Sequence, residues 1–178
     1  KPLKAFDQQD LVITCSSFSK TLAPGLRIGW VLPTERIKER IQNLKAAISV
    51  TTSTLDQFLI SQFLAVGAYE RHLRQLRNSL KKQIIRTALS IQNHFPPQTR
   101  LAIPNGGTLL WVQLPPKVDG IKVYQEALNE NIAIIPGGVC SNAGQFSNFI
   151  QISCGSPFTK NSEKGIETLG KIISSLSH

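Results

Sequence analysis

The sequence predicts an α/β fold, and two features of its 178 residues support that prediction. Short apolar runs of the length of buried strands recur between polar turns. Longer segments with an apolar residue every three or four positions separate them, and this spacing is typical of helices that bury one face. A chain of this length is enough for one sizeable core or one and a half small ones.

Two strands and two helices are expected in the first part of the chain. The apolar runs at residues 11–14 and 28–32 predict short buried strands, and Pro33 ends the second. Thr34 has the hydroxyl of a helix N-cap, so a helix should follow it. Ser53 begins a sequence that resembles a capping box and opens the next helix. Since that helix is apolar on nearly every side, we expect it to be buried or to lie at a subunit interface.

A long helix and a second α/β lobe are expected next. Gly67 marks a joint, and an apolar stripe predicts one helix from Ala68 to about Gln92, stopped by Pro96–Pro97. The pattern then predicts further strands and helices at residues 101–103, 109–114, 119–130, 132–135, 149–154 and from Thr159 onward. A long helix before a new α/β pattern indicates a connection between two lobes.

The formal net charge of +9 raises the question of nucleic-acid binding. Six of the twenty Lys and Arg residues share one segment with a single acid, Glu70: Arg71, Arg74, Arg77, Lys81, Lys82 and Arg86. Because the other face of that segment is apolar, the charges indicate a solvated helix face. No aromatic interleaving, winged-helix pattern or zinc finger accompanies them. We therefore expect no direct DNA binding by these residues.

The cysteines and the absence of methionine give further predictions about the kind of protein. Cys15, Cys140 and Cys154 lack C-x-x-C spacing, which indicates buried free thiols in a reducing compartment and no metal site. No apolar run reaches the roughly 20 residues of a membrane helix, so we expect a cytoplasmic protein without membrane contact. The chain has no methionine, even at residue 1, which predicts a fragment of a longer protein.

The strongest chemical signal lies between Cys15 and Trp30. An apolar run leads into three serines and Lys20, and Arg27 stands at the start of a second apolar run. Two strands joined by such a loop would bring hydroxyls, an ammonium and a guanidinium into one small volume. Hydroxyls donate to phosphate oxygens, a guanidinium binds two of them at once, and a neutral lysine attacks carbonyl groups. On residue types alone, a polar loop with two surface cations is the alternative.

The order of these residues resembles a known motif. Ser17-Phe18-Ser19-Lys20 followed by Pro24-Gly25-Leu26-Arg27-Ile28-Gly29 resembles the lysine motif of fold-type I pyridoxal-phosphate (PLP) enzymes. It is most similar to class I/II aminotransferases of the 2-aminoadipate and kynurenine aminotransferase branch, and to the aminotransferase-like half of MocR-type regulators in the GntR superfamily. The stretch from Gly67 to Arg77 favours the MocR branch. The resemblance implies that Lys20 forms a Schiff base with PLP and that Ser17, Ser19 and Arg27 hold its phosphate.

The resemblance also implies the C-terminal part of a PLP-dependent transferase fold. Residues 1–33 would end the PLP-binding large domain and carry the loop with Lys20. Residues 34–95 would be connecting helices, and residues 96–178 a small C-terminal α/β domain. The family's partners of the cofactor ring precede the lysine motif, and Asp7 and Asp10 do not match them. We therefore expect PLP in the full-length protein and not in this fragment alone.

The position expected to bind the substrate differs from the family pattern. Family members usually carry, on a late strand, an arginine that grips the substrate α-carboxylate, and Gln151 stands at the matching position. Glutamine lacks both the charge and the bidentate fork. It indicates either a degenerate site or an effector without an ordinary α-carboxylate. Gly106 and Gly107 resemble a glycine pair near the family's substrate, with a plain hairpin turn as the alternative.

Two functions compete on these residues. The first is a MocR-type transcriptional regulator that senses PLP or an amine or amino acid at Lys20 and binds DNA only through an upstream domain. The second is a genuine PLP-dependent aminotransferase, favoured by the intact lysine motif. A degenerate interaction module without cofactor is a third reading. The resemblance implies a homodimer, and whether the protein is an active enzyme stays open.

Overall fold

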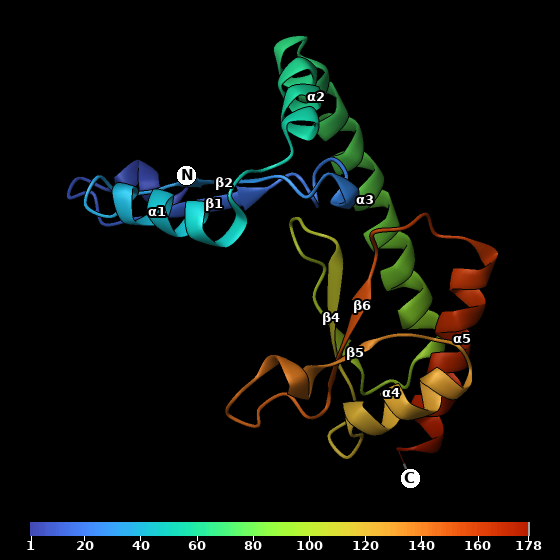
Figure 1. The fold of residues 1–178 in the computed structure, drawn as a ribbon. Coiled ribbons are helices and arrows are strands. Elements are labelled where there is room, and N and C mark those ends of the chain that lie inside the picture. Colours follow the sequence, from blue (N-terminus) through green and yellow to red (C-terminus); the bar gives the residue numbers. More distant parts are fainter. Residues whose placement is uncertain (178) are drawn as a thin grey trace. The chain divides into compact units, whose positions relative to one another are not determined.

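The computed structural model describes residues 1–177, so His178, the last residue of the expected small domain, lies outside the described part. The chain divides into two compact units, Lys1–Leu76 and a second one that begins at Arg77. Helices and strands are mixed along the chain, as expected of the predicted α/β class (Figure 1).

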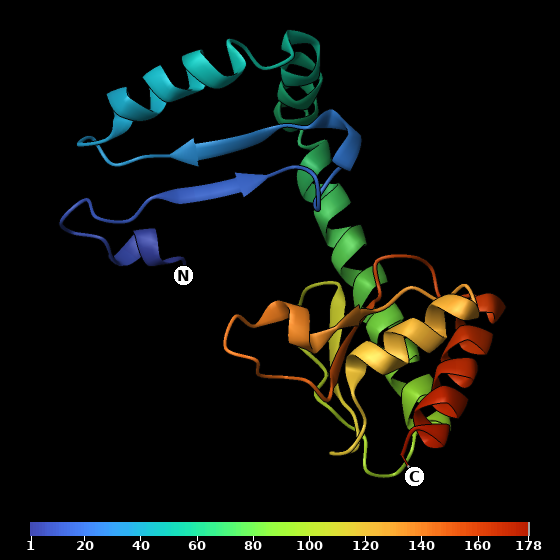
Figure 2. The same cartoon turned by 60° about the horizontal axis from the view of Figure 1, so that its bottom comes forward.

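The first unit contains an antiparallel hairpin. β1 (Thr14–Ser17) pairs with β2 (Gly29–Leu32), and Ser17 lies opposite Gly29. Position 29 requires glycine because a Cβ there would lie 2.9 Å from the carbonyl oxygen of Ser16. A 3-10 turn, η2 (Pro24–Leu26), lies in the connection between the strands (Figure 2).

The prediction of two buried strands is wrong in this unit. The first strand starts at Thr14 rather than at Leu11, and the residues of β2 are exposed, with Trp30 at 46%. The physical reason is that a two-stranded sheet leaves both faces and both edges uncovered by other strands.

Two helices of the first unit, α1 (Lys38–Ser49) and α2 (Thr54–Ala65), begin close to where the sequence places them. A short 3-10 helix, η1 (Leu3–Phe6), was not predicted. Ser53 caps α2 as predicted, accepting a hydrogen bond from the Asp56 amide at 3.4 Å. Thr34 is not the N-cap of α1, because Ile37 holds that position and the Thr34 carbonyl only closes the preceding turn.

Helix α2 is not buried within the described chain. Ile60 is its only buried residue. Phe63 is half-buried, and four other large apolar side chains are exposed: Leu55, Phe58, Leu59 and Leu64. The expectation of burial on several sides is therefore not met by the described residues.

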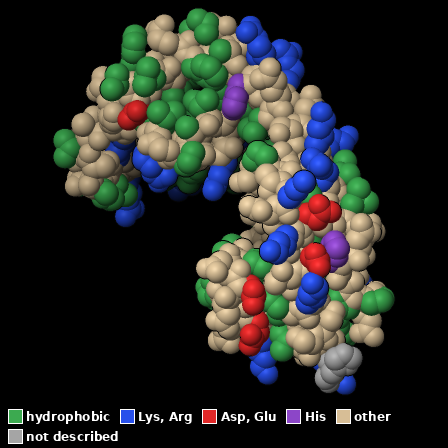
Figure 3. Space-filling model, turned by 90° about the vertical axis from the view of Figure 1, so that its right-hand side faces the viewer, with side chains coloured by type: hydrophobic (Ala, Val, Ile, Leu, Met, Phe, Trp, Pro, Cys, Tyr) green, Lys and Arg blue, Asp and Glu red, His purple; other side chains and the backbone are tan. Residues whose placement is uncertain are grey.

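Helix α3 (Ala68–His94) confirms the predicted long helix. It starts after Gly67, whose φ of +66° is a left-handed conformation that favours glycine. The six cations picked out by the sequence are all exposed, which confirms a solvated face. Figure 3 shows a face of the molecule on which Lys and Arg side chains outnumber Asp and Glu.

The second unit has a four-stranded antiparallel sheet of order β3-β4-β6-β5. Its strands are β3 (Arg100–Leu101), β4 (Leu109–Gln113), β5 (Ile135–Pro136) and β6 (Phe149–Ser153), with a 3-10 turn, η3 (Gly137–Cys140), after β5. The strand predicted at residues 132–135 is therefore paired only at its end.

Two capped helices complete the second unit. Asp119 caps α4 (Gly120–Asn129) by accepting from the Ile121 amide at 2.9 Å. Thr159 caps α5 (Lys160–Ser175) in a capping box with Ser162. Both starting points are those that the sequence predicts.

The core of the second unit joins one sheet face to three helices. Leu110, Val112, Ile150 and Ile152 of the sheet pack with residues of α3, α4 and α5. Cys154 is buried in this core, whereas Cys15 and Cys140 are exposed, so the prediction of buried thiols is wrong for two of the three. Among the described helices, none is both long and apolar enough to cross a membrane.

Candidate functional site

The connection between β1 and β2, which we call the lysine loop (residues 18–28), is closed by its own backbone. The Phe18 amide donates to the carbonyl of Ile28 at 3.0 Å. The amides of Leu22 and Ala23 both donate back to the Phe18 carbonyl, at 2.8 and 3.1 Å. Lys20 therefore lies within a short closed turn instead of a long open loop.

The four predicted anchoring residues lie in or next to this loop. Ser17 is the last residue of β1 and is exposed, Ser19 is half-buried, and Lys20 is exposed. Arg27 follows η2 in a left-handed conformation with φ of 51°, and its Nη1 donates to the Pro24 carbonyl at 3.4 Å. Neither Lys20 nor Arg27 forms an ion pair within residues 1–177. Both cations are thus available to a ligand.

The residue types of the loop fit a phosphate group. Two hydroxyls flank Phe18, and Arg27 lies two residues before Gly29, which pairs directly with Ser17. Hydroxyl donors and a bidentate guanidinium are the groups that bind phosphate oxygens. The αL backbone of Arg27 fixes the point at which its side chain leaves the chain.

Sequence reasoning missed two residues whose side chains form hydrogen bonds with the lysine loop. Tyr69 and His72, both on α3, form hydrogen bonds with Thr21 at 2.9 Å each. Both residues lie in the stretch from Gly67 to Arg77, whose only signal in the sequence is its resemblance to the MocR branch. Their contacts cross 48 and 51 positions of the chain, so no local pattern predicts them.

A second missed cluster stabilises the segment that leads into β1. Lys4 Nζ donates to Asp7 at 2.9 Å and to Asp10 at 2.8 Å. Hydrogen bonds from the Leu11 amide and Lys4 hold the pKa of Asp7 well below its ordinary value. A bond from Lys4, with a further one from the Glu35 amide at 2.7 Å, lowers the pKa of Asp10. These aspartates thus have structural partners, which agrees with their exclusion from the cofactor motif.

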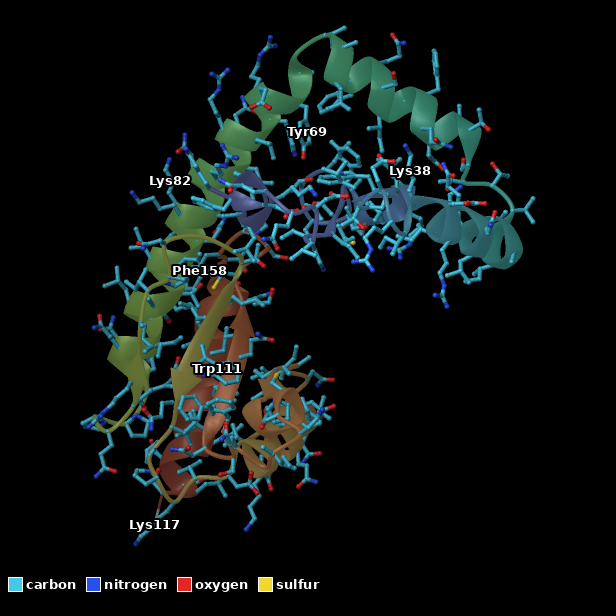
Figure 4. All side chains as sticks on the ribbon, turned by 90° about the vertical axis from the view of Figure 1, so that its left-hand side faces the viewer. Lys38, Tyr69, Lys82, Trp111, Lys117 and Phe158 are labelled. Atoms are coloured by element: carbon cyan, nitrogen blue, oxygen red, sulfur yellow. The ribbon has the colours of Figure 1, made fainter. Side chains whose placement is uncertain are left out.

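In the second unit, Gln151 lies on the sheet face opposite the core. Its neighbours Ile150 and Ile152 are buried, and side chains alternate along a strand, so Gln151 points to the other face. Trp111 of β4 lies directly opposite it, and Ile135 of β5 flanks it on the other side. Figure 4 shows Trp111 on its strand.

Gly106 and Gly107 line a different surface of the same unit. They belong to a pocket of about 510 Å³ whose other wall is α3, including Arg77, Lys81 and Ile85. Gly107 has φ of +96°, which explains the glycine without any ligand. Gln151 does not line this pocket. The structure therefore does not gather the three predicted substrate residues around one cavity of the second unit.

Comparison with known proteins identifies relatives over nearly the whole chain. The family Aminotransferase class I and II matches residues 3–169. The HTH-type transcriptional regulator YjiR of Escherichia coli is 31% identical over 173 residues, which are 97% of this chain and 37% of the regulator. The regulator YdcR of the same organism is 33% identical over 172 residues, 97% of this chain and 36% of its own length.

A solved structure supports the fold independently. The kynurenine aminotransferase of Pyrococcus horikoshii, crystallised with PMP, superimposes with a TM-score of 0.90 at 25% identity. The match covers 97% of this chain and 43% of that protein, so the chain spans less than half the length of the relatives it matches. By its family match and its mixed α/β fold, the chain belongs to the class I and II aminotransferase family, as the lysine motif predicted.

Proposed function

We propose that this chain is the aminotransferase-like effector domain of a MocR-type transcriptional regulator that carries PLP on Lys20. The observation behind the proposal is an intact lysine loop combined with a glutamine at position 151. The loop supplies the means of holding the cofactor, and the glutamine weakens the grip on an amino-acid carboxylate. The E. coli relatives, named as HTH-type transcriptional regulators, support this reading.

The lysine loop provides the groups that hold the cofactor. When bound, PLP supplies an aldehyde that bonds to an amine and a ring that withdraws electrons. In this chain Lys20 provides the amine, and its exposure leaves that amine accessible. The hydroxyls of Ser17 and Ser19 would donate to the phosphate, and Arg27 would bind two of its oxygens.

Gln151 argues against efficient transamination of common amino acids. A neutral amide gives hydrogen bonds about half as strong as those of a charged guanidinium, and it cannot bind both carboxylate oxygens in a fork. A sensor needs only ligand-dependent occupancy, whereas an enzyme must hold its substrate while protons move. The effector would therefore be an amine or an amino acid held mainly by contacts other than its α-carboxylate.

A genuine aminotransferase is the second candidate. The unmodified Ser-x-Ser-Lys and Arg27, with the structural likeness to kynurenine aminotransferase, favour it. In that case Lys20 would also transfer a proton during each turnover. We expect the full-length protein to form a homodimer under either proposal, and DNA contact to come from another domain.

One experiment tests the proposal and separates it from the enzyme. The full-length protein is mixed with PLP, reduced with borohydride and digested, and we expect the cofactor mass on Lys20 and no such mass in Lys20→Ala. Amino acids and amines are then added to unreduced protein. A regulator changes its DNA affinity without sustained formation of keto acid, whereas an aminotransferase produces keto acid over many turnovers. Absence of any Lys20 adduct would overturn both readings.

A further inference from the structure

Thr21, the residue directly after Lys20, is held by two side chains of α3. The Tyr69 hydroxyl donates to Thr21 Oγ1 at 2.9 Å. His72 Nε2 lies 2.9 Å from the Thr21 carbonyl oxygen. A carbonyl oxygen only accepts, so Nε2 carries the proton and donates. Residues three apart on a helix share one face, and α3 thus presents both donors to the same residue.

Phe18, which precedes Lys20 in the loop, also contacts α3. The Phe18 ring meets the Tyr69 ring edge-on, with centroids 5.7 Å apart. Phe63 of α2 packs against Tyr69 and His72 at 6.4 and 6.3 Å and holds both rings in place. Figure 4 shows Tyr69 on the N-terminal part of α3. Lys20 is therefore bracketed by Phe18 and Thr21, and both contact Tyr69.

We propose that Tyr69 and His72 are positioning residues for Lys20, an inference that rests on the proposed attachment of PLP there. The loop's own hydrogen bonds close the turn, but they do not fix its direction relative to α3. The two bonds to Thr21 add that constraint at both the side chain and the backbone. Displacing a reacting amine by about 1 Å slows its reaction strongly. Holding Thr21, the neighbour of Lys20, therefore favours reaction at Lys20.

Simple packing of α3 on the hairpin is the competing explanation, and chemistry can separate the two. Tyr69→Phe keeps the ring and its contacts with Phe18 and Phe63 and removes only the hydroxyl. Thr21→Val keeps the shape of Thr21 and removes the acceptor. If the hydrogen bond between Tyr69 and Thr21 orders the loop, either substitution removes that same bond. The double variant should then show the same loop order as each single variant. If only packing matters, neither substitution changes the loop.

The chain offers matched controls for these variants. Tyr124, the only other tyrosine, lies on α4 and forms no side-chain hydrogen bond among residues 1–177, so Tyr124→Phe removes a hydroxyl elsewhere. His94→Gln changes a histidine at the other end of α3 and serves as the control for His72→Gln.

The test measures loop order and Lys20 reaction separately in the full-length protein. Amide exchange at Leu22 and Ala23, whose amides bond to Phe18, reports the order of the loop without any cofactor. We expect Tyr69→Phe and His72→Gln to speed this exchange about two- to tenfold, the range for one lost hydrogen bond. The rate at which borohydride traps PLP on Lys20 should fall by a similar factor, with both controls at the wild-type values.

Each outcome has a defined meaning. Unchanged exchange in Tyr69→Phe and His72→Gln would overturn the inference, and faster exchange with an unchanged trapping rate would show that loop order does not serve Lys20. Faster exchange in the variants, in a protein that never traps PLP even as wild type, would remove the proposed function and leave the contact with α3 supported.

Discussion

Trp111 on β4 lies directly opposite Gln151 on β6 in the antiparallel pairing. Phe149 stacks on Trp111 with ring centroids 5.4 Å apart, and Phe146 meets both rings edge-on. The carboxamide of Gln151 is therefore next to an aromatic surface. A ligand on this sheet face would gain apolar contact from the rings and only neutral hydrogen bonds from Gln151.

Gln151→Arg should strengthen carboxylate binding. In the PLP-loaded full-length protein, we expect about a tenfold gain in affinity for amino acids, because a charge-assisted bidentate contact replaces a neutral one. Amines without a carboxylate should show no gain. Spectral titration measures both ligand classes. Gln125→Arg adds the same charge on the exposed part of α4, and an equal gain in that variant would show a general charge effect instead.

Arg27→Lys tests the bidentate phosphate contact. A lysine keeps the positive charge and loses the planar fork, so we expect PLP affinity to fall about tenfold while the protein stays folded. Equilibrium dialysis of PLP against the full-length protein gives the affinity. Arg36→Lys, at another exposed arginine of the same unit, is the control and should leave the affinity unchanged. Equal PLP affinities in wild type and Arg27→Lys would remove Arg27 from the site.

Local signals in the sequence predicted most elements of the fold. Capping residues such as Asp119 and Thr159 mark their helices correctly, because the cap needs only neighbours in sequence. Burial of the hairpin strands was predicted wrongly, and α2 is largely exposed within the described chain although burial or a subunit interface was expected, since apolar composition does not say what covers a surface. The residues of the lysine motif lie in one hairpin because they are contiguous in sequence, whereas the contacts of Tyr69 and His72 with Thr21 depend on tertiary structure alone.

The free energy of unfolding should depend on pH through the cluster of Lys4, Asp7 and Asp10. The folded state lowers the pKa of both aspartates, so their contribution is present above the unfolded value of about 3.9 and is lost as the pH falls through the lower folded values. Asp7→Asn should therefore destabilise the protein at neutral pH, and the difference from wild type should shrink below about pH 4. Urea unfolding at several pH values measures this difference.

A matched control distinguishes the cluster from general charge effects. Glu126→Gln removes one exposed carboxylate from α4. That carboxylate forms no ion pair within the described residues. Its stability relative to wild type should be nearly independent of pH over the same range. If Asp7→Asn followed the same course as Glu126→Gln, the hydrogen bonds to Asp7 would contribute nothing to folding.

Two glycines of α5 should respond in opposite ways to alanine. A Cβ at Gly170 would collide with the backbone carbonyl of His94, which cannot move aside as a flexible side chain does. A Cβ at Gly165 would meet no atom within 4 Å. We expect Gly170→Ala to lower the free energy of unfolding by about 1–3 kcal/mol through overpacking.

Gly165→Ala should instead raise the free energy of unfolding by about 0.5–1 kcal/mol, because alanine is the better helix former and nothing obstructs it. Denaturant unfolding of both variants beside wild type gives the two signs in one series. Since the two positions share one helix, a common change in helix propensity predicts the same sign for both. Stabilisation by Gly170→Ala would therefore show that the C-terminal end of α3 does not pack closely on α5 at this position.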